Sequence, residues 1–404
     1  MKLVLLALAV WTLTLGAAEK KAIVPAIGPK PVGPYTPGIL AGDYLYVSGQ
    51  GARDADGKFA ETPEGRVRQC LENVKAIVTA AGLTMEHVVY TQVYLHPSVS
   101  YDVLNKVWPE YFSKNPPARA TLGLHRMPTE TTVEVSAVAT THLERKKAII
   151  PAGWPKMNLS PGMMVGDRLY ISSLLGRDPV SGKIPETPAA QVQLALDRMK
   201  AVLAAAGMDF RHMVFINPYL TSAVPMSVMN EVYAKHFEHG NTPARATIQV
   251  AFLPHEGTIE FTGIAIKDLS KRIAIRPKNM PPSPTASPCV FAGDTYYCSA
   301  KSGFIPGVNG GIFADNVEDQ LRMTMRNLLD GLEEAGLNFS HVVASNVYVD
   351  NLDEFGKMNA VYAKYFGSLP PTRTTVSPLA PVERKRHANG TFPKLEEVSI
   401  VAVK

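Results

Sequence analysis

The spacing of apolar positions changes along the first 145 residues, and the changes predict an order of strands and helices. Residues 38–47 are rich in Val, Ile, Leu and Tyr around a Gly-Asp turn, which is typical of a β-hairpin. Apolar residues recur at i, i+3, i+4 and i+7 over 67–81, which predicts an amphipathic helix ending at Gly82. Further elements are predicted as a strand at 88–95, a helix at 105–112, and strands at 120–124 and 132–139. The order β-β-α-β-α-β-β predicts an α+β domain whose helices cover one face of a sheet.

The same landmarks recur twice more along the chain, about 125 to 129 residues apart. This period is far longer than that of solenoid repeats and is the size of a domain. We therefore predict three tandem domains, at 19–145, 146–270 and 271–404, after an N-terminal segment at 1–18. The sheet face without helices needs a cover, so we expect the three units to pack around a pseudo-threefold axis, like a closed homotrimer in one chain.

Composition narrows the class of protein. With 404 residues, 46% hydrophobic and 19% charged, the chain is neither disordered nor fibrous. Its net charge of +5 is spread along the sequence, so no nucleic-acid partner is expected. Residues 1–18 resemble a cleaved export signal, with Lys2, an apolar run at 3–15 and small residues at 16–18. The apolar run is too short to span a membrane, so we expect no membrane span. An export signal that is cleaved predicts a periplasmic or extracellular protein.

Export would place the three cysteines in an oxidising compartment. A turn at Gly293-Asp294 sets Cys289 opposite Cys298, which permits a cross-strand disulfide. Opposed strand positions also hold small unlinked hydrophobic residues, so both interpretations stay open. Cys70 lies on an apolar helix face and is expected to be a buried, unreactive thiol.

One arginine and one glutamate recur in every unit. They are Arg119, Arg245 and Arg373, with Glu134, Glu260 and Glu397. Each arginine stands between a proline-containing turn and an apolar strand, where its guanidinium could bind a ligand carboxylate. Each glutamate interrupts an apolar strand and could instead form a structural ion pair with the arginine. An unpaired glutamate in such a setting would have a raised pKa and could act as a general acid or base.

Repeated serines and asparagines are further candidates. They are Ser48, Ser172 and Ser299, and Asn105, Asn230 and Asn359. The chain has no Gly-x-Ser-x-Gly motif, so a serine hydrolase is not expected. The asparagines could orient a substrate or bond a helix to a loop. No Cys/His spacing indicates a metal site, and no glycine-rich motif indicates a phosphate or dinucleotide.

Three local features have simpler interpretations. Pro109 removes the backbone donor that would bond the carbonyl of Asn105 within the second helix. An insertion at 382–394 with several basic residues is expected to be a solvated loop. Three glycosylation sequons are interpreted as chance matches, at Asn158, Asn338 and Asn389.

Several motifs of the first unit together resemble the RidA family. Their order and spacing carry the resemblance: Gly33-Pro34-Tyr35, Val47-Ser48-Gly49-Gln50, Asn73 with Ala80-Ala81-Gly82, Asn105, Pro117-Ala118-Arg119-Ala120-Thr121 and Val133-Glu134-Val135. This family is also called YjgF/YER057c/UK114 or, in older usage, the L-PSP endoribonucleases. The likeness spans nearly all of the first unit and, more weakly, the other two. It implies a chorismate-mutase-like trimer with ligand clefts between adjacent subunits.

The resemblance also implies an activity. Many members hydrolyse enamines and imines such as 2-aminoacrylate to a 2-keto acid and ammonia, without a cofactor. By this resemblance Arg119 would hold the substrate carboxylate and Glu134 would position or activate water. Tyr35, Ser48 and Asn105 would shape the cleft. A small-molecule carboxylate is thus the expected ligand.

The three units depart unequally from the family pattern. Tyr35 is replaced by Leu159 and Ala286 in the second and third units. Because each cleft should combine residues from two units, the single tyrosine allows at most one fully furnished site. We therefore expect one competent cleft and two altered or inert ones. A non-catalytic carboxylate-binding or scaffold protein is the alternative; ribonuclease activity is disfavoured by the modest charge and the lack of a histidine pair.

Overall fold

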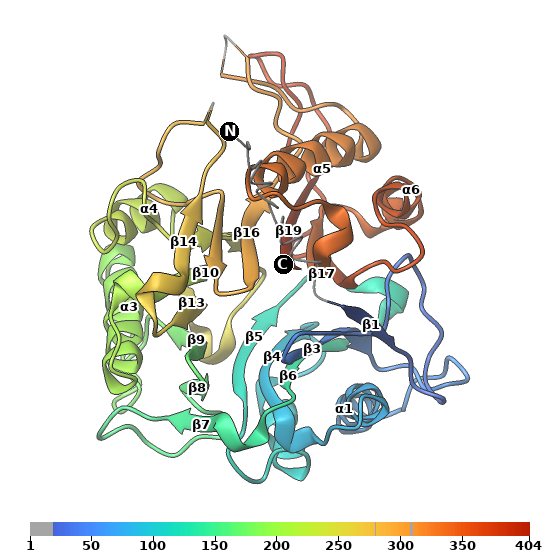
Figure 1. Cartoon of the computed structure of the whole chain (residues 1–404), viewed down its shortest axis with the longest axis vertical. Helices are drawn as coiled ribbons and strands as arrows, with labels where there is room; N and C mark the ends of the chain where they lie inside the picture. Colours follow the sequence, from blue (N-terminus) through green and yellow to red (C-terminus); the bar gives the residue numbers. More distant parts are fainter. Residues whose placement is uncertain (1–18, 279, 308–309) are drawn as a thin grey trace, which may run out of the picture.

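The computed structural model describes residues 19–278, 280–307 and 310–404. The predicted export signal at 1–18 lies outside this part of the chain. Three mixed sheets are arranged around a common centre with their helices on the outside, which is the predicted α+β pseudo-trimer (Figure 1). We refer to residues 19–145, 146–270 and 271–404 as units 1, 2 and 3. Within the described residues, the helices are too short or too polar to cross a membrane.

Unit 1 forms a six-stranded sheet in the order β1-β2-β3-β6-β4-β5, in which β5 is parallel to β4. Its elements are β1 (Lys20–Ile23), β2 (Gly38–Ala41), β3 (Tyr44–Gly51), α1 (Pro63–Ala80), β4 (Val88–Leu95), α2 (Tyr101–Val107), β5 (Ala118–Gly123) and β6 (Val133–Thr140). The edge strand β1 was absent from the predicted order. It pairs with β2 and extends the hairpin by one strand.

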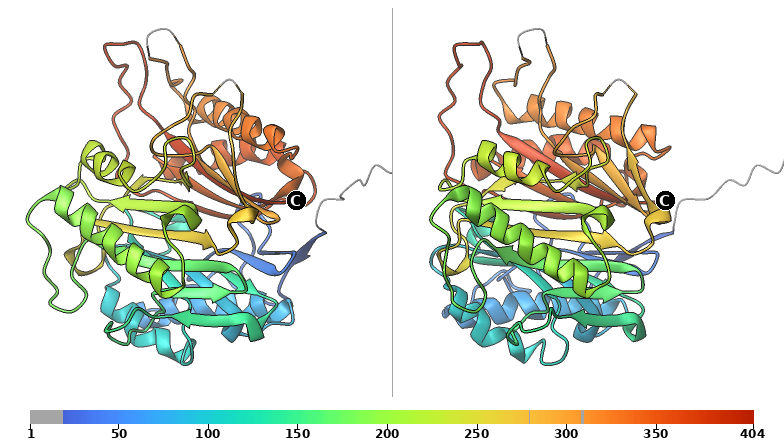
Figure 2. Two further views of the ribbon diagram at one scale, coloured as in Figure 1. Left: turned by 60° about the vertical axis from the view of Figure 1, so that its left-hand side comes forward. Right: turned by 90° about the vertical axis from the view of Figure 1, so that its left-hand side faces the viewer.

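Units 2 and 3 repeat this topology. Unit 2 contains β7 (Lys146–Ile149), β8 (Gly162–Val165), β9 (Arg168–Leu175), α3 (Pro188–Ala205), β10 (Met213–Leu220), α4 (Met226–Ala234), β11 (Ala244–Arg245), β12 (Ile248–Gln249) and β13 (Ile259–Ile266). Unit 3 contains β14 (Arg272–Ile275), β15 (Cys289–Ala292), β16 (Thr295–Lys301), α5 (Val317–Glu334), β17 (Val342–Val349), α6 (Phe355–Tyr362), β18 (Thr372–Val376) and β19 (Glu396–Val403). Figure 2 shows α3 on the outer side of its sheet and the 382–394 segment projecting from unit 3.

The second helix of unit 1 differs from its prediction over 105–112. It begins earlier because the Ser100 hydroxyl caps it, accepting a 3.3 Å hydrogen bond from the backbone N–H of Val103. It ends at Val107, and a short 3₁₀ turn (Trp108–Glu110) follows, with Pro109 inside it. Pro109 lacks the N–H that would continue the α-helix, so the change of helix type occurs at the proline.

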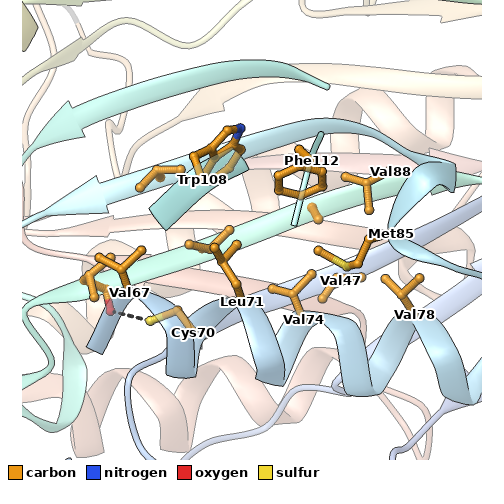
Figure 3. Close-up of a cluster of buried hydrophobic side chains, with 14 of the residues drawn as sticks. Val47, Val67, Cys70, Leu71, Val74, Val78, Met85, Val88, Trp108 and Phe112 are labelled. Carbon is orange, nitrogen blue, oxygen red and sulfur yellow. Dashed lines mark hydrogen bonds between the residues drawn. The ribbon is translucent and has the colours of Figure 1, made fainter. Parts of the chain in front are cut away.

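Each unit has its own hydrophobic core between helices and sheet. In unit 1, Cys70, Leu71 and Val74 of α1 pack against Trp108 and Phe112 (Figure 3). Burial raises the pKa of the Cys70 thiol well above its usual value, consistent with the predicted unreactive side chain.

The sheet faces without helices pack against one another. One apolar cluster contains Ile39 of unit 1, Tyr170 of unit 2 and Val343 of unit 3, all nearly inaccessible to solvent. At the same interface the buried Arg168 guanidinium donates 3.0 Å hydrogen bonds to the Ala292 carbonyl and the Thr295 hydroxyl. The three units are thus docked on each other rather than strung apart on linkers.

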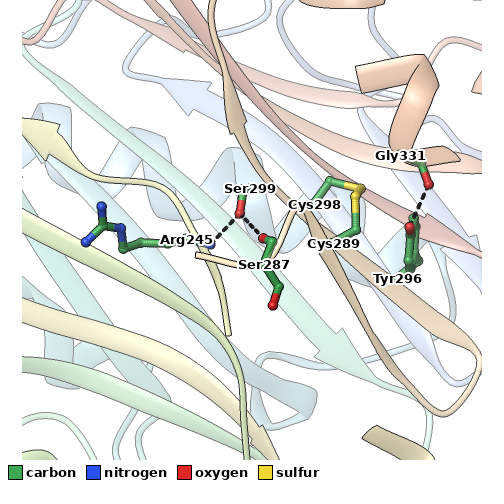
Figure 4. Close-up of a disulfide and its surroundings, with 7 residues drawn as sticks. All are labelled: Arg245, Ser287, Cys289, Tyr296, Cys298, Ser299 and Gly331. Atoms are coloured by element: carbon green, nitrogen blue, oxygen red, sulfur yellow. Dashed lines mark hydrogen bonds between the residues drawn. A yellow bond between two sulfur atoms is a disulfide. The ribbon is translucent and has the colours of Figure 1, made fainter. Parts of the chain in front are cut away.

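The β15–β16 hairpin has the predicted register, with Cys289 directly opposite Cys298. The two residues form a disulfide and their Cα atoms lie 4.0 Å apart (Figure 4). Both side chains are buried under α5.

Candidate functional site: three unequal clefts between units

A repeated serine fixes the position of the repeated arginine across every boundary between units. Each serine Oγ accepts the backbone N–H of the arginine in the adjacent unit and donates to a carbonyl twelve residues earlier in its own unit. The pairs are Ser48 with Arg373 (3.0 Å), Ser172 with Arg119 (2.8 Å) and Ser299 with Arg245 (2.8 Å; Figure 4). Both hydrogen-bonding functions of each hydroxyl are therefore used to hold the boundary.

This arrangement decides which arginine faces which glutamate. Glu134, Glu260 and Glu397 occupy equivalent places, each paired with a tyrosine on the neighbouring strand of its sheet. Glu134 shares a cleft with Arg373, at the boundary of units 1 and 3, and not with Arg119 of its own unit. We call this the open cleft. The cleft of Arg119 between units 1 and 2 is the filled cleft, and that of Arg245 between units 2 and 3 is the basic cleft.

The open cleft encloses a cavity of about 310 Å³ lined by Arg373, Glu134, Tyr35, Gln50 and Phe355, among others. The Arg373 guanidinium carbon lies 5.5 Å from the ring centre of Tyr35 and 5.5 Å from that of Phe355. These distances allow cation–π attraction, which orients the guanidinium plane between rings from two units.

Arg373 has hydrogen-bond donors to spare. Its Nη1 and Nη2 atoms and the Oδ1 atom of Asn359 are buried, and none has a hydrogen-bond partner within the described residues. A buried polar atom without a partner is unfavourable, so the two Nη atoms are poised to donate to an acceptor that enters the cavity, and the Asn359 oxygen to accept from a donor. Burial also lowers the pKa of Arg373, although the group remains a cation at any physiological pH.

A glycine makes room beside this guanidinium. A Cβ atom on Gly33 would lie 2.5 Å from Nη2 of Arg373 and 3.1 Å from Nδ2 of Asn359. Any larger residue at this position would displace the guanidinium and the Asn359 side chain from where they lie.

Glu134 is 6% exposed, and burial raises its pKa to about 8 even though the charge of Arg373 opposes the shift. Space for its carboxyl group depends on Gly49, because a Cβ there would overlap Oε1 of Glu134. The other units have Ser173 and Ala300 at the position of Gly49. Only unit 1 therefore leaves its glutamate this space.

The filled cleft is occupied by the protein's own side chains. Nη2 of Arg119 donates to the Tyr101 hydroxyl at 2.9 Å and to Oδ1 of Asn105 at 2.7 Å. The Trp108 ring centre lies 4.7 Å from the guanidinium carbon, and Arg119 is only 1% exposed. The Asn105 carbonyl, which Pro109 leaves without a helical donor, accepts a 3.2 Å hydrogen bond from Nδ2 of Asn158 in unit 2.

The glutamate of the filled cleft is engaged as well. The Ser173 hydroxyl donates to Oε1 of Glu260 at 2.7 Å. Burial raises the pKa of Glu260 to about 8, as it does for Glu134. Because Ser173 replaces glycine, this carboxyl group is bonded within its own unit rather than presented to a cavity.

The basic cleft retains a cavity, of about 460 Å³. Nη1 of Arg245 donates to Oδ1 of Asn230 at 2.7 Å. Glu397 forms an ion pair with Lys394. Lys301 also lines this cavity, at the position that Gln50 holds in unit 1.

The structure gathers Tyr35, Glu134 and Arg373 around one cavity, with Asn359 next to Arg373 beside Gly33, and places the other candidates elsewhere. The sequence prediction missed the aromatic groups that fill a cleft, Tyr101 and Trp108, and it missed Phe355. The other units have different residues at the positions of Trp108 and Phe355. This difference between the units is the one sequence signal that could have identified them as cleft residues. In the described part of the chain, His, Cys, Asp and Glu side chains form no group of three that could hold a metal ion.

Comparison with known proteins gives one consistent match. The sequence model of the family described as endoribonuclease L-PSP matches residues 26–141, 152–267 and 280–381. A RutC family protein from Saccharolobus solfataricus is 38% identical over 125 residues, which cover 30% of this chain and 97% of that protein.

Two further matches have similar extents. A protein from Bos taurus named 2-iminobutanoate/2-iminopropanoate deaminase is 38% identical over 109 residues, covering 27% of this chain and 79% of that protein. The crystal structure of the YjgF gene product from E. coli is 30% identical and covers 30% of this chain and 98% of that chain, with a TM-score of 0.29. The two sequence relatives thus match a length of chain about equal to one of the three units.

Proposed function

The chain belongs to the endoribonuclease L-PSP family, also called the RidA family, in three tandem copies, and on this premise we propose that its open cleft hydrolyses small 2-imino or 2-enamino carboxylates. The observation that carries the proposal is the pair formed by Arg373 and Glu134. One is a buried cation with unpartnered donors and the other a carboxyl group with a pKa near 8, and both face one cavity. The imine deaminase from Bos taurus is the relative whose name points to this chemistry.

Arg373 would bind the substrate carboxylate. Its two free Nη atoms present the planar fork that a carboxylate accepts with both oxygens. Asn359, whose Oδ1 is also free, would accept an N–H from the substrate amine or imine nitrogen. These contacts would hold the reacting carbon of the substrate beside the Glu134 carboxyl group, which raises the rate by fixing the orientation of the reacting groups.

Glu134 would move the protons. With a pKa of about 8 it is mostly protonated at neutral pH and can give its proton to the imine nitrogen. Water then adds to the carbon, and Glu134 takes back a proton from that water, which leaves a neutral carbinolamine. A second transfer from Glu134 to nitrogen lets the C–N bond break and ammonia depart, and the hydroxyl proton returns to Glu134. In the net reaction, one imine and one water molecule give one 2-keto acid and one ammonia molecule.

The non-catalytic alternative would be favoured if all three arginines were held by the glutamates. In the structure two of the glutamates have partners other than the arginines: Ser173 donates a hydrogen bond to Glu260, and Lys394 forms an ion pair with Glu397. Glu134 has the charge of Arg373 nearby, but the two leave a cavity between units rather than closing it. The geometry of the open cleft therefore favours the enzyme over the scaffold.

The test is ammonia release from enzymatically generated 2-aminoacrylate. We expect Arg373→Gln to lower kcat/KM about 10- to 100-fold, which corresponds to the loss of a charge-assisted contact. The matched variant is Arg119→Gln, at the same position of unit 1, and it should affect stability more than rate because Arg119 is sealed by Tyr101 and Asn105. A chain without activity above background, or equal rate losses in both variants, would overturn the proposal.

A further inference from the structure

The basic cleft differs from the open cleft in the charges on its wall. Arg245 and Lys301 line the same cavity of about 460 Å³. Lys301 comes two residues after the serine that bonds Arg245, where unit 1 has the neutral Gln50 two residues after Ser48. A second cation therefore stands beside the guanidinium in this cleft.

One carboxylate lines this cavity, that of Glu397, and it offsets only part of the positive charge although it acts on Arg245. Glu397 is paired with Lys394, which neutralises it. Asp330 is the acidic group whose charge acts on Lys301, and it is itself paired with Arg326 at 2.9 Å. The cavity wall around Arg245 and Lys301 thus carries an excess of positive charge.

Both cations are also poorly hydrated. Burial lowers the pKa of Lys301 and that of Arg245. Both side chains remain partly exposed; the Lys301 ammonium group has no hydrogen-bond partner among the residues that the structure describes, whereas Arg245 is bonded to Asn230. A partly desolvated pair of cations is a favourable place for an anion, because the anion replaces lost hydration.

The cavity can take more than a three-carbon acid. Ala286 lines it at the position of Tyr35, and this cavity is larger than that of the open cleft, about 460 against 310 Å³. The smaller side chain leaves room for a second acidic group beyond the one that Arg245 would hold.

We propose that the basic cleft binds a small organic dianion without hydrolysing it, with one acidic group on Arg245 and the second on Lys301. Dicarboxylates and phosphorylated carboxylic acids share this chemistry; both are called dianions here for their two anionic groups, and the phosphate group carries up to two of the charges. The Glu397 carboxylate, tied to Lys394, is not available to move protons as Glu134 is in the open cleft. The proposal does not depend on catalysis in the open cleft, so a failed deaminase assay leaves it standing.

The experiment is calorimetric titration of the whole chain carrying Arg373→Gln, which removes anion binding in the open cleft. The probes are succinate, 3-phosphoglycerate and, as a monoanion, butanoate. We expect one dianion site per chain, with at least ~10-fold weaker binding of butanoate, because a charge-assisted contact is lost. Comparing the affinities for succinate and 3-phosphoglycerate shows whether the cleft prefers a dicarboxylate or a phosphorylated acid.

Two variants locate the site. Lys301→Gln restores the residue of unit 1 and should weaken dianion binding at least ~10-fold, as should Arg245→Gln. Lys364→Gln, at an exposed position of unit 3, makes the same change in net charge and should leave the affinity unchanged. Thermal unfolding of each variant checks that it is folded. Equal affinities in the Lys301 and Lys364 variants, equal affinity for butanoate, or no saturable binding of either dianion would overturn the proposal.

Discussion

The Oγ atom of Ser48 accepts a 3.0 Å hydrogen bond from the backbone N–H of Arg373, and this contact joins the first unit to the last. The same hydroxyl donates to the Thr36 carbonyl, just after Tyr35. One serine therefore fixes the backbone of the arginine and the loop of the tyrosine on the two sides of the open cleft.

We expect Ser48→Ala to destabilise the protein and to weaken substrate binding. The Arg373 N–H would remain buried without a partner, which costs about 1–3 kcal/mol. Urea unfolding measures the stability, and steady-state kinetics should show a raised KM. Ser299→Ala is the matched control, because it removes the same bond at the basic cleft. If both variants raise KM equally, Ser48 has no special role in the open cleft.

Gly49 is a position at which a single added methyl group should slow catalysis strongly. In Gly49→Ala the added methyl group would overlap Oε1 of Glu134 and force the carboxyl group to turn away. Misplacing a catalytic group by about 1 Å lowers rates on the order of 100-fold, so kcat should fall by 10- to 100-fold. Ala300→Gly, the reverse change at the basic cleft, serves as the control. A kcat for Gly49→Ala close to that of the wild type would contradict the geometry.

Stability should fall as the pH rises from about 4.5 to about 8. Burial raises the pKa of Glu260 and of Glu396 to about 8 in the folded chain, against 4.5 in a solvated carboxyl group. Between these values the folded state keeps a proton that the unfolded state releases, so each group lowers the free energy of unfolding by about 1.4 kcal/mol per pH unit. Above pH 8 this dependence ends.

The measurement is urea unfolding at pH 5.5 and pH 7.5. Replacing Glu260 by Gln should make the free energy of unfolding less dependent on pH, because the amide does not titrate. Glu396→Gln should act similarly at its site beside Thr324, outside the three glutamates of the clefts. Slopes equal to that of the wild type in both variants would show that these carboxyl groups are charged in the folded state.

The disulfide between Cys289 and Cys298 should stabilise unit 3 by about 2–3 kcal/mol, as expected for a closed loop of this length. The double variant with alanine at both positions should lower the free energy of unfolding by that amount. Thiol labelling of unreduced, unfolded protein should detect Cys70 alone. Labelling of three thiols would mean that the bridge does not form in the isolated protein.

Much of the fold followed from the sequence because it depends on local pattern and on repetition. The Gly293-Asp294 turn set the register of the cysteine hairpin, and the predicted strand 88–95 is β4. The edge strand β1 and the early start of α2 escaped prediction. The first is only four residues long, and the second depends on a cap at Ser100, outside the apolar pattern.

The candidate site was less predictable, because the sequence does not say in which direction the units meet. The motifs of one unit suggested Arg119 as the partner of Glu134, whereas the boundary between the first and last units supplies Arg373. The expectation of unequal clefts from the single Tyr35 agrees with the different side chains that surround the three arginines. What each wall does stays a prediction until the variants above are measured.

Linking three such units in one polypeptide changes what a single substitution can do. In a homotrimer every mutation appears three times, so a site can be remodelled only by remodelling all its copies. Here a lysine at one boundary, or a tryptophan at another, alters one cleft and leaves its neighbours as they were. Because the three units lie in one chain, each cleft can change independently, and the three related clefts can have different functions.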